Sequence, residues 1–156
     1  MISQVQRLVE PPLQWARHAE PWLQSLALLA ARLYLWQVFF TSGLTKIRDW
    51  EATLFLFSEE YHVPVLPPEL AAWMGTGGEL VFSSLLAVGL LSRPAAVGVF
   101  MLNAVAAYSY PEISAAGLKD HVLWAVLSLA LVLFGPGRLA LDAWLMPRLF
   151  PTLRLR

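Results

Sequence analysis

Apolar residues fall along the chain in four long runs, which short polar or proline-rich stretches separate. The runs cover residues 24–46, 69–91, 94–111 and 120–136. Each approaches the roughly 20 apolar residues that a helix needs to cross a bilayer. Prolines stand at most of the boundaries: Pro64, Pro67, Pro68, Pro94, Pro111 and Pro136. The pattern predicts an all-α integral membrane protein, with a four-transmembrane-helix bundle in a single domain over residues 1–156.

Three further segments are too polar to span the membrane and too apolar to stay in water. Residues 47–68 contain the stretch "WEATLFLF" among charges and prolines, which predicts an amphipathic or partly re-entrant cap between the first two spans. Residues 1–22 offer no apolar core for a cleavable signal peptide. There we expect an interfacial segment with Trp15 and Trp22. The tail 138–150 is expected to form a second interfacial helix.

The composition agrees with a membrane protein, since 58% of the residues are hydrophobic and only 14% are charged. The mean hydropathy is +0.58. The chain has no cysteine, which excludes disulfides, thiolate metal sites, iron–sulfur clusters and catalytic thiols. Redox chemistry would therefore need a bound cofactor or other side chains. Because no basic stripe is present, a nucleic-acid partner is not expected.

Lysines and arginines outside the spans are unevenly distributed, and such residues concentrate on the cytoplasmic side. One side carries seven: Arg7, Arg17, Arg93, Arg138, Arg148, Arg154 and Arg156. The other carries three: Lys46, Arg48 and Lys119. The count predicts a multi-pass protein with both termini in the cytoplasm. The opposite face is acidic, with Asp49, Glu51, Glu59, Glu60, Glu69, Glu112 and Asp120. An external protein partner is expected on this acidic face.

Two ionisable residues, Arg32 and Glu79, are predicted near the middle of the membrane. At 1.5 Å per residue they lie roughly 12 Å and 15 Å inside the ends of their helices. A charge at that depth costs a few kcal/mol and usually faces another polar group inside the protein. A stripe of small and polar residues turns Glu79 inward: Ala72, Gly75, Thr76, Ser83 and Ala87. We therefore expect Arg32 to be the counter-charge of Glu79, in a pair that is either functional or purely structural.

The outer half of the predicted interior is rich in polar groups: Lys46, Glu79, Asn103, Tyr108 or Tyr110, Asp120 and His121. Each also has a structural interpretation. Lys46 can extend to the interface, His121 can be part of a polar helix start beside Asp120, and Asn103 can bond between helices. His18, His62 and His121 lack a metal-binding spacing, so no metal site is predicted.

Three motifs then resemble the DoxX family of small bacterial four-helix membrane proteins. They are "ARLYLWQVFFTSGLTKIRDW", "GTGGELVFSSLLAVGLLSRPAA" and "GLKDHVLWAVLSLALVLFGPGRLALD". The resemblance covers roughly residues 28–142. The family's C-terminal "LSLD" is "LALD" in this chain, at residues 139–142, so only the serine of that motif differs. It implies a bacterial inner-membrane subunit of a redox system, since relatives include thiosulfate:quinone oxidoreductase subunits. The motif residues carry over to Arg32, Gly43, Lys46, Glu79, His121 and Asp142.

Three functional hypotheses follow, two of them close in weight. In the first, the protein is a subunit of an oxidoreductase that passes electrons from a periplasmic partner to quinone. Lys46 and His121 would bind the quinone carbonyls, with Tyr108 nearby. Glu79 would carry the proton, and Arg32 would set its charge. This makes Glu79, His121 and Lys46 the catalytic candidates, and Arg32, Lys46, Tyr108 and His121 the cofactor-binding ones.

In the second hypothesis the protein has no chemistry of its own. Its acidic outer face and the 47–68 cap would hold a periplasmic or secreted partner at the membrane, and the polar interior would be structural. Metal handling through His62 and His121 ranks third. The sequence leaves open whether the protein turns over a substrate and whether it forms a homo-oligomer.

Overall fold

A computed structural model describes the backbone of residues 2–149 and the side chains of residues 17–149. Over this range the chain is helical and contains no strand. The helices are α1 (Ile2–Arg48), α2 (Trp50–Phe55), the π-helix η1 (Leu56–Glu60), α3 (Pro68–Val88), α4 (Ser92–Ser109), α5 (Ala115–Phe134) and α6 (Leu141–Leu149). Trp15, Phe150 and the terminal Arg7, Arg154 and Arg156, on which parts of the sequence interpretation rest, lie outside the described side chains.

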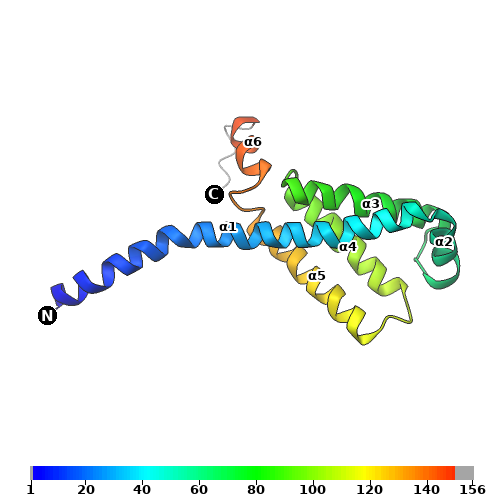
Figure 1. Ribbon diagram of the computed structural model, residues 1–156, viewed down its shortest axis with the longest axis horizontal. Helices are drawn as coiled ribbons and strands as arrows, with labels where there is room; N and C mark the ends of the chain where they lie inside the picture. Colours follow the sequence, from blue (N-terminus) through cyan, green and yellow to red (C-terminus); the bar gives the residue numbers. More distant parts are fainter. Residues whose placement is uncertain (1, 150–156) are drawn as a thin grey trace.

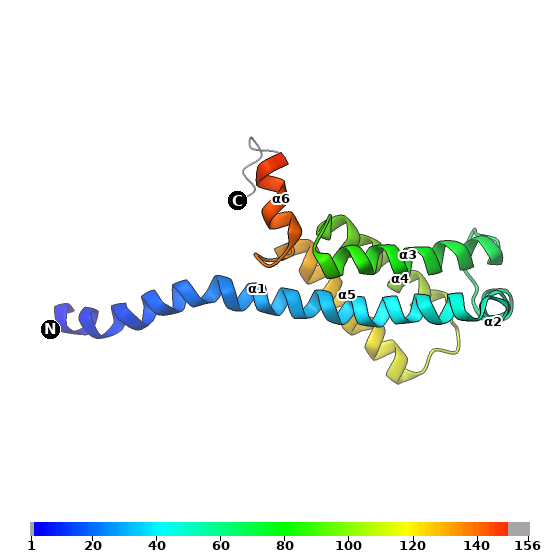
Figure 2. The same ribbon diagram turned by 45° about the horizontal axis from the view of Figure 1, so that its top comes forward.

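The long helices pack in chain order around one core. α3 runs back along α1, α4 packs against α3, and α5 packs against α4 and crosses α1 (Figures 1 and 2). Four fully buried side chains come one from each of these helices: Leu35, Leu86, Val99 and Leu131. The small and polar stripe of α3 faces inward as predicted, since Ala72 and Ser83 are completely buried.

Three helices are long and apolar enough to cross a membrane: Arg17–Arg48, Pro68–Val88 and Ala115–Phe134. They contain most of the first, second and fourth predicted spans. α4 is not among them, because small and polar residues such as Ser92, Arg93 and Asn103 reduce its apolar character. That α4 also crosses the membrane stays a prediction. α1 begins at Ile2, so the interfacial segment predicted before the first span is continuous with it in one helix.

The segment after α1 forms a cap over one end of the molecule. Asp49 caps α2 by accepting from the Ala52 backbone N–H at 3.0 Å. The Thr53 hydroxyl donates to the Lys46 carbonyl at 2.9 Å and ties α2 to the end of α1. Phe57 of η1 packs with Ala71 and Ala72 of α3. The predicted cap is therefore two short helices and a loop, and we call residues 49–67 the cap from here on.

The opposite end is held by two charged side chains, Asp142 and Arg32, that bond to backbone groups. The Asp142 carboxylate accepts from the backbone N–H groups of Leu91 and Ser92, at 2.8 and 2.7 Å, where α4 begins. A carboxylate is favourable at a helix N-terminus because the unpaired N–H groups carry partial positive charge. Arg32 of α1 is fully buried and donates from Nη2 to the Leu139 carbonyl at 2.6 Å. The motif residues Arg32 and Asp142 thus join α1, the α3–α4 hairpin and the tail.

Candidate functional site

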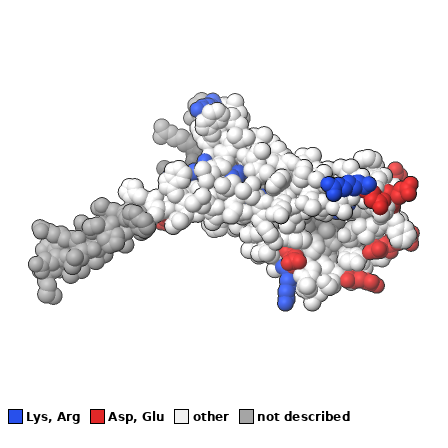
Figure 3. Space-filling view, in the orientation of Figure 1, with Lys and Arg blue, Asp and Glu red and all other residues white. Residues whose placement is uncertain are grey.

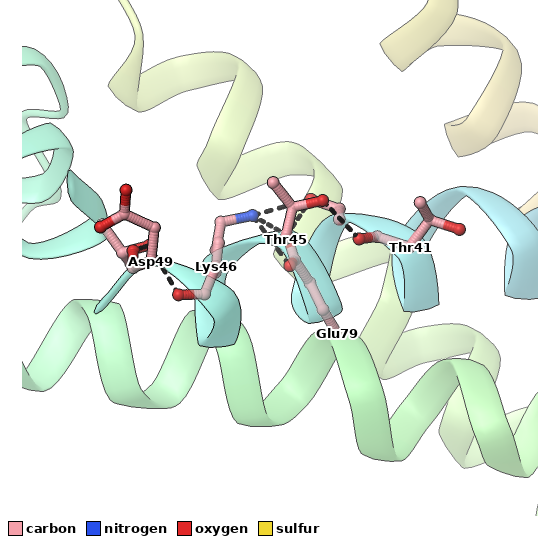
Figure 4. A network of polar contacts seen from close by, with 7 residues as sticks. Thr41, Thr45, Lys46, Asp49 and Glu79 are labelled. Atoms are coloured by element: carbon pink, nitrogen blue, oxygen red, sulfur yellow. Dashed lines mark hydrogen bonds and ion pairs between the residues drawn. The ribbon is translucent and has the colours of Figure 1, made fainter. Parts of the chain in front are cut away.

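An ion pair between α1 and α3 forms the centre of the candidate site. Lys46 Nζ lies 2.8 Å from Glu79 Oε2, and the two side chains are only 14% and 13% exposed. The same nitrogen donates to Glu79 Oε1 at 2.9 Å and to Ser42 Oγ at 2.7 Å. The Ser42 hydroxyl in turn lies 3.3 Å from Glu79 Oε1. Figure 4 shows the Lys46 side chain turned toward Glu79 across the two helices.

A glycine allows this contact. A Cβ on Gly43 would lie 2.8 Å from the Leu80 side chain and 3.4 Å from Glu79 Cβ, so α1 and α3 are too close here for a larger residue. Ser42 and Lys46 are four positions apart and share one helix face. The "GLTK" stretch of the sequence therefore supplies a close approach and, one turn later, the cation that meets Glu79.

The predicted pairing of Arg32 with Glu79 is wrong. Arg32 and Lys46 are 14 positions apart on α1, which is about 21 Å along a helix. Since α3 runs antiparallel, Glu79 lies beside Gly43 while Arg32 lies beside Gly89, at the other end of α3. Arg32 Nε and Nη1 have no hydrogen-bond partner among the described residues, and the carboxylate that acts electrostatically on Arg32 is Asp142, not Glu79. Arg32 therefore does not set the charge of Glu79.

A cavity of about 350 Å³ opens beside the ion pair. Lys46 and Glu79 are part of its wall. The rest is almost wholly apolar, with side chains from α3, α4 and the cap such as Phe57, Leu66, Phe82 and Leu102. This volume is at the lower end of the roughly 300–1,000 Å³ usual for small-molecule sites, which combine apolar walls with a few polar groups. The cavity is the candidate site because it combines an apolar wall with a buried ion pair.

Tyr61 brings a phenol to the same cavity, and the sequence interpretation missed it. Its N–H donates to the Leu56 carbonyl, five residues earlier, at 2.9 Å, which is the wide turn of a π-helix. The ring stacks edge-on between Phe57 and Tyr110, with centroids 5.1 and 5.4 Å away. Burial, followed by the negative charge of Glu79, raises the pKa of Tyr61. At neutral pH the side chain is therefore an undissociated phenol that can donate a hydrogen bond.

Two of the predicted site residues lie away from the cavity. Tyr108 is 78% exposed and does not line it. His121 of α5 instead bonds to Asn103 of α4: its Nδ1 lies 2.8 Å from Asn103 Oδ1, and Asn103 Nδ2 donates to the His121 carbonyl at 2.9 Å. Asn103 is thus the interhelical hydrogen bond that its structural interpretation expected. The site that the structure assembles is Lys46, Glu79 and Tyr61, without Arg32, Tyr108 or His121.

Metal ligands do not gather within the described part of the chain. No group of three or more His, Asp or Glu side chains there could hold a metal ion. His62 belongs to the cap, where its backbone N–H donates to the Ser109 carbonyl at 2.8 Å. His121 belongs to α5, where its Nδ1 bonds to Asn103 of α4. The proposed pairing of His62 and His121 at a metal therefore receives no support from the geometry.

The sequence is similar to a known protein family and to one bacterial protein. The sequence model of the DoxX family matches residues 27–112, more than half of the chain. An uncharacterised protein of Haemophilus influenzae is 31% identical over 136 residues, which cover 81% of this chain and 87% of that protein. No solved structure matches. The region matched by the family includes Lys46, Tyr61 and Glu79 but ends before His121.

Proposed function

The chain belongs to the DoxX family of membrane proteins, and on that premise we propose that it is a quinone-binding membrane subunit of a redox system. One observation carries the proposal: a buried ion pair lies on the wall of an otherwise apolar cavity. In a membrane such a cavity favours an apolar molecule with a polar head. Because Lys46 and Glu79 neutralise each other, the head that fits is uncharged; an anion would meet Glu79 and a cation would meet Lys46.

The hydrogen-bond donors suit a head with carbonyl acceptors. Within the described residues no hydrogen bond uses the Tyr61 hydroxyl. The Ser109 hydroxyl, also at the cavity, is buried without a partner there. Lys46 Nζ already donates to three oxygens, so a ligand carbonyl would replace Ser42. Two donor positions, Tyr61 with Ser109 at one end and Lys46 deeper, match a molecule with two carbonyl oxygens.

Each residue at the cavity has a proposed role in binding the quinone. When bound, a quinone would accept two electrons from a reduced partner protein, together with two protons. Tyr61 Oη donates a hydrogen bond to one carbonyl and Lys46 Nζ to the other, which holds the head in the cavity. Glu79 keeps Lys46 in place and is the carboxylate proposed to pass a proton. Phe57 and the rest of the cap exclude water from the outer end of the cavity.

Changing Tyr61 to phenylalanine tests this assignment. The change removes one hydroxyl and keeps the ring stacked between Phe57 and Tyr110. Loss of one hydrogen bond, about 0.5–1.5 kcal/mol, should weaken quinone binding roughly 2- to 12-fold in titrations of the purified protein. Tyr108→Phe is the matched control and should bind as the wild type does. Wild-type protein that retains no quinone on lipid extraction and binds none on titration would refute the proposed function.

His121→Ala separates the revised site from the one that the sequence predicted. Because His121 does not line the cavity, the folded variant should bind quinone normally, although Asn103 loses its partner.

The acidic end of the molecule favours a second candidate function, docking of a basic partner protein. Figure 3 shows acidic side chains gathered at the end that carries α2. The exposed carboxylates of the cap and of the neighbouring helix ends are Asp49, Glu51, Glu59, Glu60, Glu69, Glu112 and Asp120. Such a field attracts a positively charged surface and speeds association at low salt. This role is compatible with electron delivery to the cavity below.

Neutralising two of these charges tests the docking role. Glu59→Gln with Glu60→Gln should slow association of a small basic electron-transfer protein several-fold at low salt, measured on immobilised protein. High salt should abolish the difference, since exposed charges are screened. Glu20→Gln, at an exposed position of α1 far from the cap, is the control. Equal binding by the double variant and the wild type at low salt would exclude the acidic end as the docking surface.

A further inference from the structure

The cavity is a wedge between α3 and α4. From the hairpin to the middle of α3 the two helices approach closely at glycines: a Cβ on Gly98 would lie 2.6 Å from Phe82, and one on Gly78 would lie 2.9 Å from Leu102. Toward the cap they separate, as Figure 1 shows. The close contact therefore closes the cavity at its inner end, and the space above it exists because the helices diverge.

The cap closes the outer end of the wedge. Phe57 and Tyr61 form part of the cavity wall there. The cap is fastened on both sides, because Thr53 donates to the Lys46 carbonyl and the His62 N–H donates to the Ser109 carbonyl at 2.8 Å. A ligand from the aqueous side would have to pass the cap that these two bonds hold in place.

The remaining side of the wedge is bounded by two methionines. Met74 of α3 and Met101 of α4 line the cavity and are 56% and 55% exposed. The contacts of Gly78 with Leu102 and of Gly98 with Phe82 fix the register of the helices, and this register places Met101 at the level of Glu79. The opening thus lies on a surface of α3 and α4 that the described residues leave uncovered, at the depth of the ion pair. Methionine side chains are flexible enough to part around an entering molecule.

We propose that the ligand enters this cavity sideways from the hydrocarbon of the bilayer, between Met74 and Met101, and that it is a long-chain quinone whose tail stays outside. This inference rests on the proposed quinone function and adds to it the route and the kind of ligand. The head reaches Lys46 and Glu79 without crossing the cap. The tail lies along the groove between α3 and α4, where it remains in contact with lipid.

Met101→Trp in full-length protein reconstituted into phospholipid vesicles tests the route. The larger side chain narrows the opening, so loading of a polyprenyl quinone should slow at least 10-fold. A tail-less, water-soluble quinone should load at a rate much closer to that of the wild type. Val97→Trp is the matched control, because Val97 is exposed on the same helix and does not line the cavity. It should load both quinones normally.

A disulfide across the cap gives a second, independent readout. The chain has no cysteine of its own, so His62→Cys with Ser109→Cys provides a single pair that fastens the cap to α4. Because Ser109 is itself one of the proposed donors, the reduced double variant is the reference: lateral entry predicts that oxidation leaves the loading rate of the long-chain quinone equal to that of the same variant in its reduced form. Loss of loading on oxidation, or equal slowing of both quinones by Met101→Trp, would overturn the lateral route. Failure of the wild type to bind either quinone would instead refute the proposed function.

Discussion

Gly89→Ala should leave little folded protein. Gly89 ends α3 in the left-handed conformation, with φ of 73°, which costs an ordinary residue roughly 1–2 kcal/mol. An added Cβ would overlap Arg32 Nη1 and would lie 2.6 and 2.8 Å from Ala140 Cβ and Cα. Arg32 is fully buried and the Ala140 contact includes backbone, so neither group can move aside cheaply. We expect a loss of about 4 kcal/mol or more, the range in which single changes unfold proteins.

Gly77→Ala is the control for this experiment. Gly77 lies within α3 and has no atom within 4 Å of the position that a Cβ would take. In a helix interior alanine is favoured over glycine by roughly 0.5–1 kcal/mol, so this variant should match or slightly exceed the wild type in thermal unfolding in detergent. If Gly89→Ala melted within a few degrees of Gly77→Ala, the packing of Arg32 against the hairpin would be incorrect.

The helices could be predicted from the sequence because their signals are local. Prolines mark their ends, and each apolar run has the length of a membrane helix. The inward stripe on α3 was also readable, since residues three and four apart share a face whatever the helix packs against. Ala72, Thr76 and Ser83 are buried accordingly.

The partner of Glu79 could not be predicted in the same way. Periodicity defines which face of a helix turns inward, but not how far one helix slides along its antiparallel neighbour. If α1 were shifted along α3 by a few helical turns, Arg32 would lie beside Glu79 in place of Lys46. The information that fixes the shift is in Gly43, which lets α1 approach α3, and in Gly89, which accommodates Arg32. Both glycines are visible in the sequence, but their contacts are long-range.

Tyr61 was missed for a different reason. It follows a π-turn in a segment without helical periodicity, so no pattern indicates that its ring points to the cavity. Tyr108 does fall within a predicted span, but its side chain turns outward. The Asn103–His121 bond shows the converse case: two polar residues inside the predicted membrane region bond to each other between helices, and His121 does not line the cavity.

The largest effect on function is expected at the ion pair, where a double variant separates structure from chemistry. Glu79→Gln alone leaves the Lys46 ammonium without its counter-charge, and Lys46→Met alone leaves the Glu79 carboxylate without its counter-charge. Breaking a buried pair costs about 3–5 kcal/mol. Since each side chain keeps 13–14% exposure, we expect the lower part of that range. Each single variant should therefore melt roughly 6–12 °C below the wild type in detergent.

The double variant, Lys46→Met with Glu79→Gln, leaves no unpaired charge, so it should recover most of that stability. Its quinone affinity should nevertheless fall at least 10-fold, because the cation that donates to one carbonyl and the carboxylate that holds it are both gone. Ser42→Ala controls for loss of the remaining polar contact and should change melting by no more than a few degrees. If the double variant regains its stability and also binds quinone as the wild type does, the pair only holds α1 to α3. The cavity would then not recognise a quinone through these charges, and docking at the acidic end would become the better account of the protein.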